Sequence, residues 1–232
     1  MNNKPRLIDW LDRLAAAQVV CVGDVMLDRF VYGEVERISP EAPIPVLRIA
    51  REAVTVGGAG NVARNLSALG TETRLFGVVG DDPAGREAAE VLSFENAVAL
   101  SLTADGGRPT TVKTRFIAGG QQLLRTDEED LTALSDQLLA QLSADVAASV
   151  SGGKCGALIL SDYGKGVLTD AMIAAAMDAA RAAGVPVVST PRAWILAAIV
   201  APASSRRTGA SWVRPRGCRS TVIPKSRRRR AT

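Results

Sequence analysis

Short apolar segments that alternate with helix-like segments are the feature that most constrains the fold of this chain. The apolar segments cover residues 19–22, 73–79, 157–160 and 185–188. Segments with helical character lie around them, at residues 6–16, 61–69, 84–92, 131–150 and 169–183. A buried parallel strand is a continuous apolar run, and parallel strands are joined by crossover helices. The alternation therefore predicts an α/β fold with a doubly wound, mostly parallel sheet.

Two more polar regions do not fit this alternation. Residues 29–33 and 44–50 have the pattern of short polar strands, separated by a turn-rich segment. Residues 109–117 and 121–127 resemble a hairpin that turns at Ala118-Gly119-Gly120. We therefore expect residues 29–50 and 109–127 to form a small β lid on the edge of the main sheet.

The composition narrows the chemistry that the chain could perform. Its 232 residues include no histidine, and its three cysteines, Cys21, Cys155 and Cys218, have spacings that fit neither a disulfide framework nor a zinc site. Ser-His-Asp hydrolysis, Cys-His proteolysis and histidine-based metal sites are excluded. The sequence contains no uninterrupted run of 18 apolar residues and no apolar core of a secretory signal, so we expect a cytoplasmic protein without a membrane partner.

The charge is divided unevenly along the chain. All 24 acidic residues and 16 of the 28 basic residues precede residue 179, and the remaining 12 basic residues follow it. An arginine-rich arm that binds nucleic acid or an anionic membrane is one interpretation. A basic, disordered tail with no selected partner is a second. A third, which we prefer, follows from the resemblance described below.

Acidic residues follow three of the apolar segments. Asp24 comes after residues 19–22, Asp81 and Asp82 come after residues 73–79, and Asp162 comes after residues 157–160. Ligands of doubly wound folds lie at the carboxyl ends of the strands, and a carboxylate accepts hydrogen bonds from sugar hydroxyls. Such residues can equally cap the following turn or helix. We predict that Asp24 and Asp162 contact a polyol, and that Asp81 and Asp82, before a proline-led helix, are caps.

A glycine-rich motif provides a second candidate ligand site. Residues 57–61, Gly-Gly-Ala-Gly-Asn, open a helix, where free backbone N–H groups favour oxygen-rich or anionic ligands. The match of Gly58, Gly60 and Ala63 to the dinucleotide fingerprint is weak, because the motif does not follow the first apolar strand. The sequence has no P-loop motif, which excludes a P-loop kinase.

Basic residues of the predicted hairpin form a third candidate. Lys113, Arg115 and Arg125 would lie above the acidic strand ends if the hairpin is a lid. Arginine grips phosphate in a fork, so this arrangement would suit a phosphorylated sugar. Each residue taken alone could equally belong to a solvated strand face.

Six ordered motifs together resemble one family. They are Val22-Gly23-Asp24-Val25-Met26-Leu27-Asp28-Arg29, Arg37-Ile38-Ser39-Pro40-Glu41-Ala42-Pro43-Ile44-Pro45-Val46, Gly57-Gly58-Ala59-Gly60-Asn61-Val62-Ala63, Thr111-Val112-Lys113-Thr114-Arg115, Gln121-Gln122-Leu123-Leu124-Arg125 and Leu160-Ser161-Asp162-Tyr163-Gly164-Lys165-Gly166. The set is similar to the kinase domain of the bifunctional heptose 7-phosphate kinases / heptose 1-phosphate adenylyltransferases, which are ribokinase-like carbohydrate kinases. The resemblance covers residues 6–188 and implies a ribokinase-like, doubly wound, mostly parallel sheet with a small β lid.

The resemblance also implies a reaction. Such kinases transfer the ATP γ-phosphate, with Mg²⁺, to the anomeric hydroxyl of D-glycero-D-manno-heptose 7-phosphate, on the route to ADP-heptose and lipopolysaccharide core. The lid of the family implies a homodimer. Carried over residue by residue, the sugar hydroxyls would be held by Asp24, Gly57, Gly58 and Asn61, the substrate's phosphate would be approached by Lys113 and Arg125, and the site would be lined by Asp162.

The resemblance ends after residue 188. The family's Gly-Ala-Gly-Asp motif, which carries the catalytic base and the anion hole, is absent from the sequence. Where the family has Asp-Pro-Lys-Gly, this chain has Thr190-Pro191-Arg192-Ala193. Codons for Ser189 to Trp212 can be chosen so that another reading frame encodes D-P-K-G-L-D-F-G-R-Y-R-G-A-S-V-I-T-P-N-R-R-E-L, which is the family's sequence there. We therefore expect residues 1–188 to be the N-terminal part of a truncated kinase domain, and residues 189–232 to be a basic, out-of-frame and disordered tail.

Without the base and the nucleotide-binding half, we expect no catalytic residue in this chain and no phosphorylation of heptose. A non-catalytic fragment that binds sugar phosphate or dimerises through the lid is the alternative. A nucleic-acid binder that acts through the basic tail is less favoured, and a Rossmann oxidoreductase is the weakest interpretation.

Overall fold

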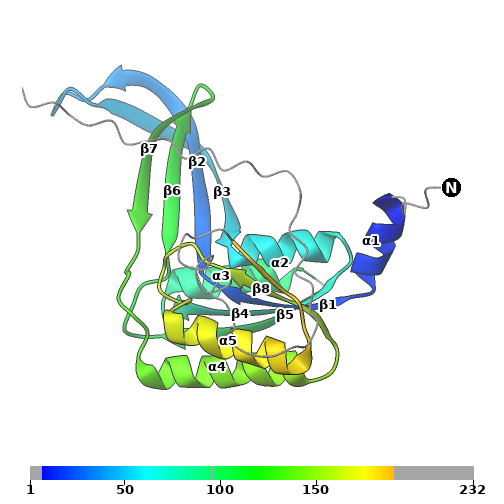
Figure 1. Cartoon of the computed structure of the whole chain (residues 1–232). Helices are drawn as coiled ribbons and strands as arrows, with labels where there is room; N and C mark the ends of the chain where they lie inside the picture. Colours follow the sequence, from blue (N-terminus) through cyan, green and yellow to red (C-terminus); the bar gives the residue numbers. More distant parts are fainter. Residues whose placement is uncertain (1–6, 96, 191–232) are drawn as a thin grey trace, which may run out of the picture.

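The computed structural model describes residues 7–95 and 97–190, which form two sheets (Figure 1). The larger sheet is wholly parallel and has the strand order β5-β4-β1-β8-β9. Its strands are β1 (Gln18–Gly23), β4 (Glu72–Gly80), β5 (Val98–Asp105), β8 (Cys155–Ser161) and β9 (Val187–Ser189). The predicted doubly wound α/β architecture is confirmed.

Helices cover both faces of this sheet, and alternate residues of β1 point to opposite faces (Figure 1). Val20 and Val22 pack in the core beneath α4 (Asp136–Ser151) and α5 (Asp170–Ala183). Cys21 packs on the other face, in the core of α2 (Ala59–Ala68) and α3 (Pro83–Ser93). The short helix α1 (Leu7–Ala15) precedes β1. Burial on both faces explains why β1 is a continuous apolar run.

The second sheet, called the lid below, has the order β3-β2-β6-β7 and rises from the main sheet (Figure 1). Its strands are β2 (Val25–Ile38), β3 (Pro45–Gly58), β6 (Val112–Ala118) and β7 (Gln121–Glu128). Strand β2 begins one residue after β1 ends, and at the base of the lid Val25 lies opposite Gly58 and Leu27 lies opposite Val112. The lid therefore starts at the carboxyl edge of the parallel sheet.

Four elements differ from the sequence predictions. Strands β2 and β3 have 14 residues each, because their inner ends are buried in the core and continue the pairing down to Gly58. Strand β5 was not expected, since it is an edge strand with no buried residue and lacks an apolar run. The helix expected over residues 131–150 begins only at Asp136, where the side chain of Ser135 accepts a hydrogen bond from Leu138 N at 3.3 Å.

The last described residues belong to the main sheet. Ser189 pairs with Leu160 in β9, and Thr190 donates its backbone N–H to the Leu160 carbonyl at 3.1 Å. The rest of the predicted basic tail, residues 191–232, lies outside the described residues. Among the helices of the described ranges, none is long and apolar enough to cross a membrane.

The predicted cap at Asp82 is confirmed and has a second role. Asp82 Oδ1 accepts hydrogen bonds from Gly85 N at 2.6 Å, which caps α3, and from Thr110 Oγ1 at 2.7 Å. Asp82 Oδ2 accepts a further bond from Thr110 N at 2.7 Å, so one carboxylate ties α3 to the segment before β6. Partial burial alone would raise the pKa of Asp82, but the hydrogen bonds from Thr110 and Gly85 outweigh it and lower the pKa below the ordinary value.

We expect Asp82→Ala to lower the free energy of unfolding at pH 7 by about 1–3 kcal/mol, because it removes a helix cap and leaves Thr110 N without its acceptor. A depressed pKa stabilises the fold above the ordinary carboxyl value of 3.8, and this contribution is lost as the pH falls through the lower folded value. Urea unfolding between pH 7 and pH 3 should show that the difference in free energy of unfolding between wild type and Asp82→Ala becomes smaller as the pH falls. Asp81→Ala is the control, since its bond from Arg86 at 3.4 Å is exposed and contributes little. An Asp82 variant that matches this control would contradict the prediction.

Candidate functional site

The candidate site lies where β1 and β8 end beneath the lid. Asp24 directly follows β1, and Asp162 directly follows β8. These strands are neighbours, and Asp24 N donates to the Ser161 carbonyl at 3.1 Å. Both aspartates are almost fully buried. The structure thus places on neighbouring strands two acidic residues that the sequence predicted only at the carboxyl ends of separate strands.

The carboxylate of Asp24 organises the loop that follows β8. Its Oδ2 accepts hydrogen bonds from Tyr163 N at 2.7 Å and Lys165 N at 3.1 Å, and its Oδ1 accepts one from Val167 N at 3.1 Å. The side chain of Asp24 therefore caps a distant loop. The capping alternative predicted from the sequence concerned the turn or helix that directly follows Asp24. Asp24 is 1% exposed, so its first role is to position this loop.

Asp162 holds the start of the same loop. Its Oδ1 accepts from Gly164 N at 2.8 Å, which closes a tight turn. Its backbone N–H donates to Thr190 Oγ1 at 2.9 Å, and Thr190 Oγ1 in turn donates to the Asp162 carbonyl at 3.1 Å. The loop after β8 is therefore fixed from both sides, by Asp24 below it and by Thr190 beside it.

The glycine-rich motif lies at the same junction, where β3 meets α2. A Cβ at Gly58, whose φ is +58°, would lie 2.1 Å from the carbonyl oxygen of Asp24. A Cβ at Gly57 would lie 2.4 Å from Asp28 Oδ2. Ala59 N donates to the Asp24 carbonyl at 2.8 Å, and Asn61 is exposed in the first turn of α2. The backbone of Asp24 thus excludes a side chain at Gly58, whereas a Cβ at Gly57 would clash with the side chains of Asp28 and Met26.

The predicted phosphate-binding residues lie on the lid and are held by carboxylates. Lys113 Nζ donates to Asp127 Oδ2 at 2.7 Å, and Arg125 Nε forms an ion pair with Asp127 Oδ1 at 2.8 Å. Arg115 donates to Asp28 Oδ1 at 2.6 Å. Lys113 and Arg125 thus share Asp127 as a counter-ion.

Sequence reasoning missed the residues that join the lid to the strand ends. Glu129, just after β7, accepts a hydrogen bond from Lys165 Nζ at 2.5 Å. Arg108 donates to the carbonyl oxygens of Lys165 and Thr132. Lys165 lies in the glycine-rich loop that the sequence singled out, so its position was accessible from the sequence. Its partner Glu129, 36 residues away, was not, because no local pattern marks that pairing.

A small hollow lies between these groups at the base of the lid. Its walls include Asp24, Arg108, Thr111, Asp130 and Lys165. Hydroxyl, carboxylate and cationic groups therefore converge on one space beside the strand ends. The space has a volume of about 10 Å³, which is enough for a water-sized group and too small for a whole sugar.

Cysteine and metal chemistry find no support in the described part of the chain. Burial raises the pKa of Cys21 to about 12 and also raises that of Cys155, so neither is a thiolate at neutral pH. Within residues 7–95 and 97–190, histidine, cysteine and acidic side chains form no group of three that could hold a metal ion.

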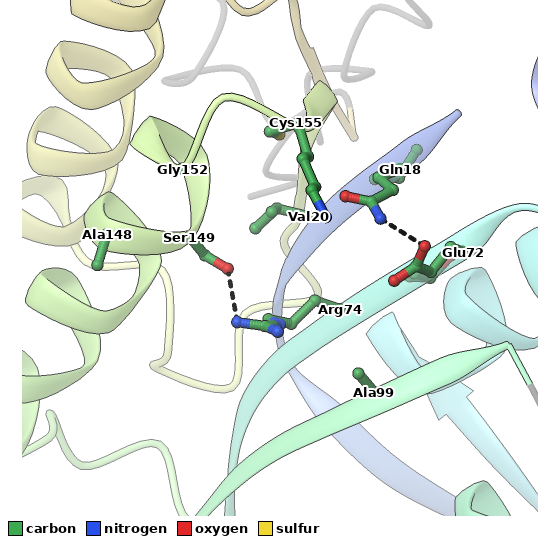
Figure 2. Close-up of a pocket in the computed structure, with 12 residues that line it drawn as sticks. Gln18, Val20, Glu72, Arg74, Ala99, Ala148, Ser149, Gly152 and Cys155 are labelled. Carbon is green, nitrogen blue, oxygen red and sulfur yellow. Dashed lines mark hydrogen bonds between the residues drawn. The ribbon is translucent and has the colours of Figure 1, made fainter. Parts of the chain in front are cut away.

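A larger pocket lies at the amino ends of the strands of the main sheet, opposite the candidate site (Figure 2). Gln18, Glu72 and Cys155, the first residues of β1, β4 and β8, line it. Gln18 donates to Glu72 at 2.5 Å, and Arg74 donates to Ser149 at 3.3 Å. The amino ends of parallel strands lie away from the edge where ligands of this architecture bind, so this pocket is separate from the candidate site.

Comparison with known proteins agrees with this geometry. The sequence profile of the pfkB family carbohydrate kinases matches residues 16–201. The Bifunctional protein HldE of Hyphomonas neptunium is 47% identical over 187 residues, which cover 81% of this chain and 38% of that protein. The Bifunctional protein HldE of a Caulobacter species is 49% identical over 179 residues, which cover 77% of this chain and 36% of that protein. The chain thus spans under two-fifths of the length of these relatives.

Solved structures give the same fold at lower identity. A carbohydrate kinase from Agrobacterium tumefaciens is 22% identical with a TM-score of 0.55, over 75% of this chain and 53% of that one. The tetrameric inhibited form of phosphofructokinase-2 from Escherichia coli is also 22% identical, with a TM-score of 0.56 over 75% of this chain and 54% of that one. These matches show the fold alone.

The covered parallel sheet, the lid and the buried strand-end aspartates define the architecture of a ribokinase-like sugar kinase. The chain belongs to the pfkB family of carbohydrate kinases. The predicted resemblance to the kinase portion of the bifunctional relatives is confirmed.

Proposed function

We propose that this chain is the sugar-binding, lid-bearing part of a kinase for D-glycero-D-manno-heptose 7-phosphate. The observation that carries the proposal is the identity of 47% to a Bifunctional protein HldE across the residues that build the site. The strand-end aspartates, the α2 amino terminus and the basic lid residues lie around one junction, which suits a hydroxylated sugar with a phosphate. The reaction would place a second phosphate on the anomeric hydroxyl, on the route to ADP-heptose and lipopolysaccharide, in the cytoplasm.

Each predicted contact has a place in this proposal. Gly57, Gly58 and Asn61 lie at the start of α2, where backbone N–H groups can face the sugar's oxygens. Asp24 and Asp162 would accept hydrogen bonds from the sugar's hydroxyl groups through their carboxylate oxygens. Lys113 and Arg125 would neutralise the substrate's own phosphate.

The proposal separates binding from turnover. ATP supplies the transferred phosphoryl group, and Mg²⁺ neutralises it in such reactions. The Gly-Ala-Gly-Asp motif that would supply the base and the anion hole is absent from the sequence. We therefore propose that this chain binds the sugar phosphate and does not phosphorylate it.

A thermal-shift titration of the purified chain tests the proposal. Heptose 7-phosphate at about 100 times its Kd should add about 2.7 kcal/mol to the free energy of unfolding, whereas NAD should add nothing. A coupled ADP-release assay with ATP and Mg²⁺ should stay at the background rate. ATP-dependent turnover would refute the absence of catalysis, and a lack of stabilisation by the sugar phosphate would refute the binding.

The proposal includes a homodimer formed through the lid. The outer lid exposes large apolar side chains that a second copy could cover, namely Ile38, Ile44, Ile49, Leu123 and Leu124. Sedimentation of the same titrated samples should give twice the monomer mass. A monomer mass at all concentrations would contradict the dimer.

A further inference from the structure

Two lysines from different parts of the fold converge on one carboxylate oxygen. Lys113 comes from β6 of the lid, and Lys165 comes from the loop after β8. Lys165 Nζ lies 2.5 Å from Glu129 Oε2, and Lys113 Nζ lies 3.4 Å from the same atom. Both lysine side chains are only 15% exposed. The two ammonium groups are thus held close together, at the point where the lid meets the strand ends.

The cluster has more positive than negative groups. Its cations are Lys113, Lys165 and Arg125, and its carboxylates are Glu129 and Asp127. The hydrogen bond from Lys165, followed by the charges of Lys165 and Lys113, lowers the pKa of Glu129 despite its partial burial. Glu129 is therefore ionised at neutral pH and attracts both ammonium groups.

The position of Lys165 is set by the sugar site itself. Asp24 accepts the backbone N–H of Lys165 at 3.1 Å, and the Lys165 carbonyl accepts from Arg108 at 3.3 Å. Only the side chain is left to move. Two ammonium groups that reach a single carboxylate oxygen can also reach the oxygens of a single phosphate, because both are compact anions that accept several hydrogen bonds.

We propose that Lys165 joins Lys113 in holding the phosphate of the sugar substrate, and that Glu129 occupies the position of this phosphate until the substrate arrives. This inference rests on the proposed function and deepens it. A phosphate that displaces Glu129 contacts the lid through Lys113 and the main sheet's loop through Lys165. A sugar without a phosphate leaves Glu129 in place. Lys165 therefore determines specificity for phosphorylated over unphosphorylated sugars.

Isothermal titration of the full chain with heptose 7-phosphate and with unphosphorylated heptose tests the proposal. Lys165→Gln should weaken binding of the phosphate ester about 10- to 100-fold, the usual effect of losing one charged hydrogen bond. Glu129→Gln should tighten it about 3- to 10-fold, because a neutral amide competes less well for the lysines. Neither variant should change the affinity for unphosphorylated heptose.

The control and the opposite direction of the two effects keep the test decisive. Lys154→Gln removes a lysine at the far edge of the sheet and should leave both affinities unchanged. A merely structural role of the Lys165–Glu129 pair cannot tighten binding when Glu129 is replaced. If wild type binds the sugar phosphate and both variants match it, the inference fails and the proposed function stands. If wild type binds neither sugar, both fail.

Discussion

Replacing Asp24 by alanine is expected to lower the free energy of unfolding by about 3–6 kcal/mol and to abolish binding of heptose 7-phosphate. The carboxylate accepts three backbone N–H groups, from Tyr163, Lys165 and Val167, in a position that is 1% exposed. Each donor left without an acceptor costs about 1–3 kcal/mol. The loop after β8 would then lose the conformation that places Lys165 at the base of the lid.

Two variants separate this effect from a general loss of an acidic residue. Asp24→Asn keeps the volume but turns one acceptor into a donor that faces a backbone N–H, so it should also destabilise the protein. Asp170→Ala removes an exposed aspartate from the first turn of α5 and should cost only a few tenths of a kcal/mol. Urea unfolding gives the free energies, and amide hydrogen exchange reports the loop directly. Retained protection at Tyr163, Lys165 and Val167 in Asp24→Ala would contradict the assignment.

Gly58→Ala is expected to lower the free energy of unfolding by about 4 kcal/mol or more. Gly58 has a φ of +58°, and its Cβ would lie 2.1 Å from the Asp24 carbonyl oxygen. This oxygen cannot move aside, because it accepts the hydrogen bond from Ala59 N that begins α2. The substitution therefore separates the lid from the strand end at the centre of the site.

Gly184→Ala is the matched control for this substitution. Gly184 has a φ of +67° at the end of α5, but no atom lies within 4 Å of the position of its Cβ. Its replacement tests the cost of the left-handed backbone conformation alone, about 1 kcal/mol. The difference between the two variants in chemical denaturation measures the clash at Gly58. Equal losses would show that no clash exists.

The sequence was sufficient for the main sheet and insufficient for its edges. The run at β1 is apolar because both faces of this strand are buried, so a local pattern records a global position. Strand β5 packs at an edge and has no buried residue. Its alternating residues Val98, Leu100 and Leu102 have a strand pattern, which a search for continuous apolar runs misses. The sequence pattern does not show that the inner ends of β2 and β3 are strands. These ends lie in the motif around Asp24 and in the glycine-rich motif, and the chain passes from the main sheet to the lid across the single residue Asp24.

The residues of the candidate site could also be predicted only in part from the sequence. The sequence placed Asp24 and Asp162 on the same rim, since parallel strands end at one edge of the sheet, but only the structure shows that their strands are neighbours. The partners of these groups could not be predicted in the same way. Asp24 binds a loop about 140 residues further along the chain, and Glu129 meets Lys165 only after the lid has folded onto the main sheet. Such contacts depend on three-dimensional closeness that no short motif records.

Because no flexible linker separates β1 from β2, the lid can rotate about its base as one rigid arm. Strand β2 has 14 residues, which corresponds to an arm of about 45 Å at the usual rise per residue. With Asp24 and Gly58 as the fulcrum, a rotation of about 5° at the base would displace the tip by about 4 Å over an arm of that length. In the same way, a force applied at the tip of the lid produces a torque at its base that increases with the length of the arm. A contact at the far end of this arm therefore exerts torque on Asp24 and Gly58 at its base.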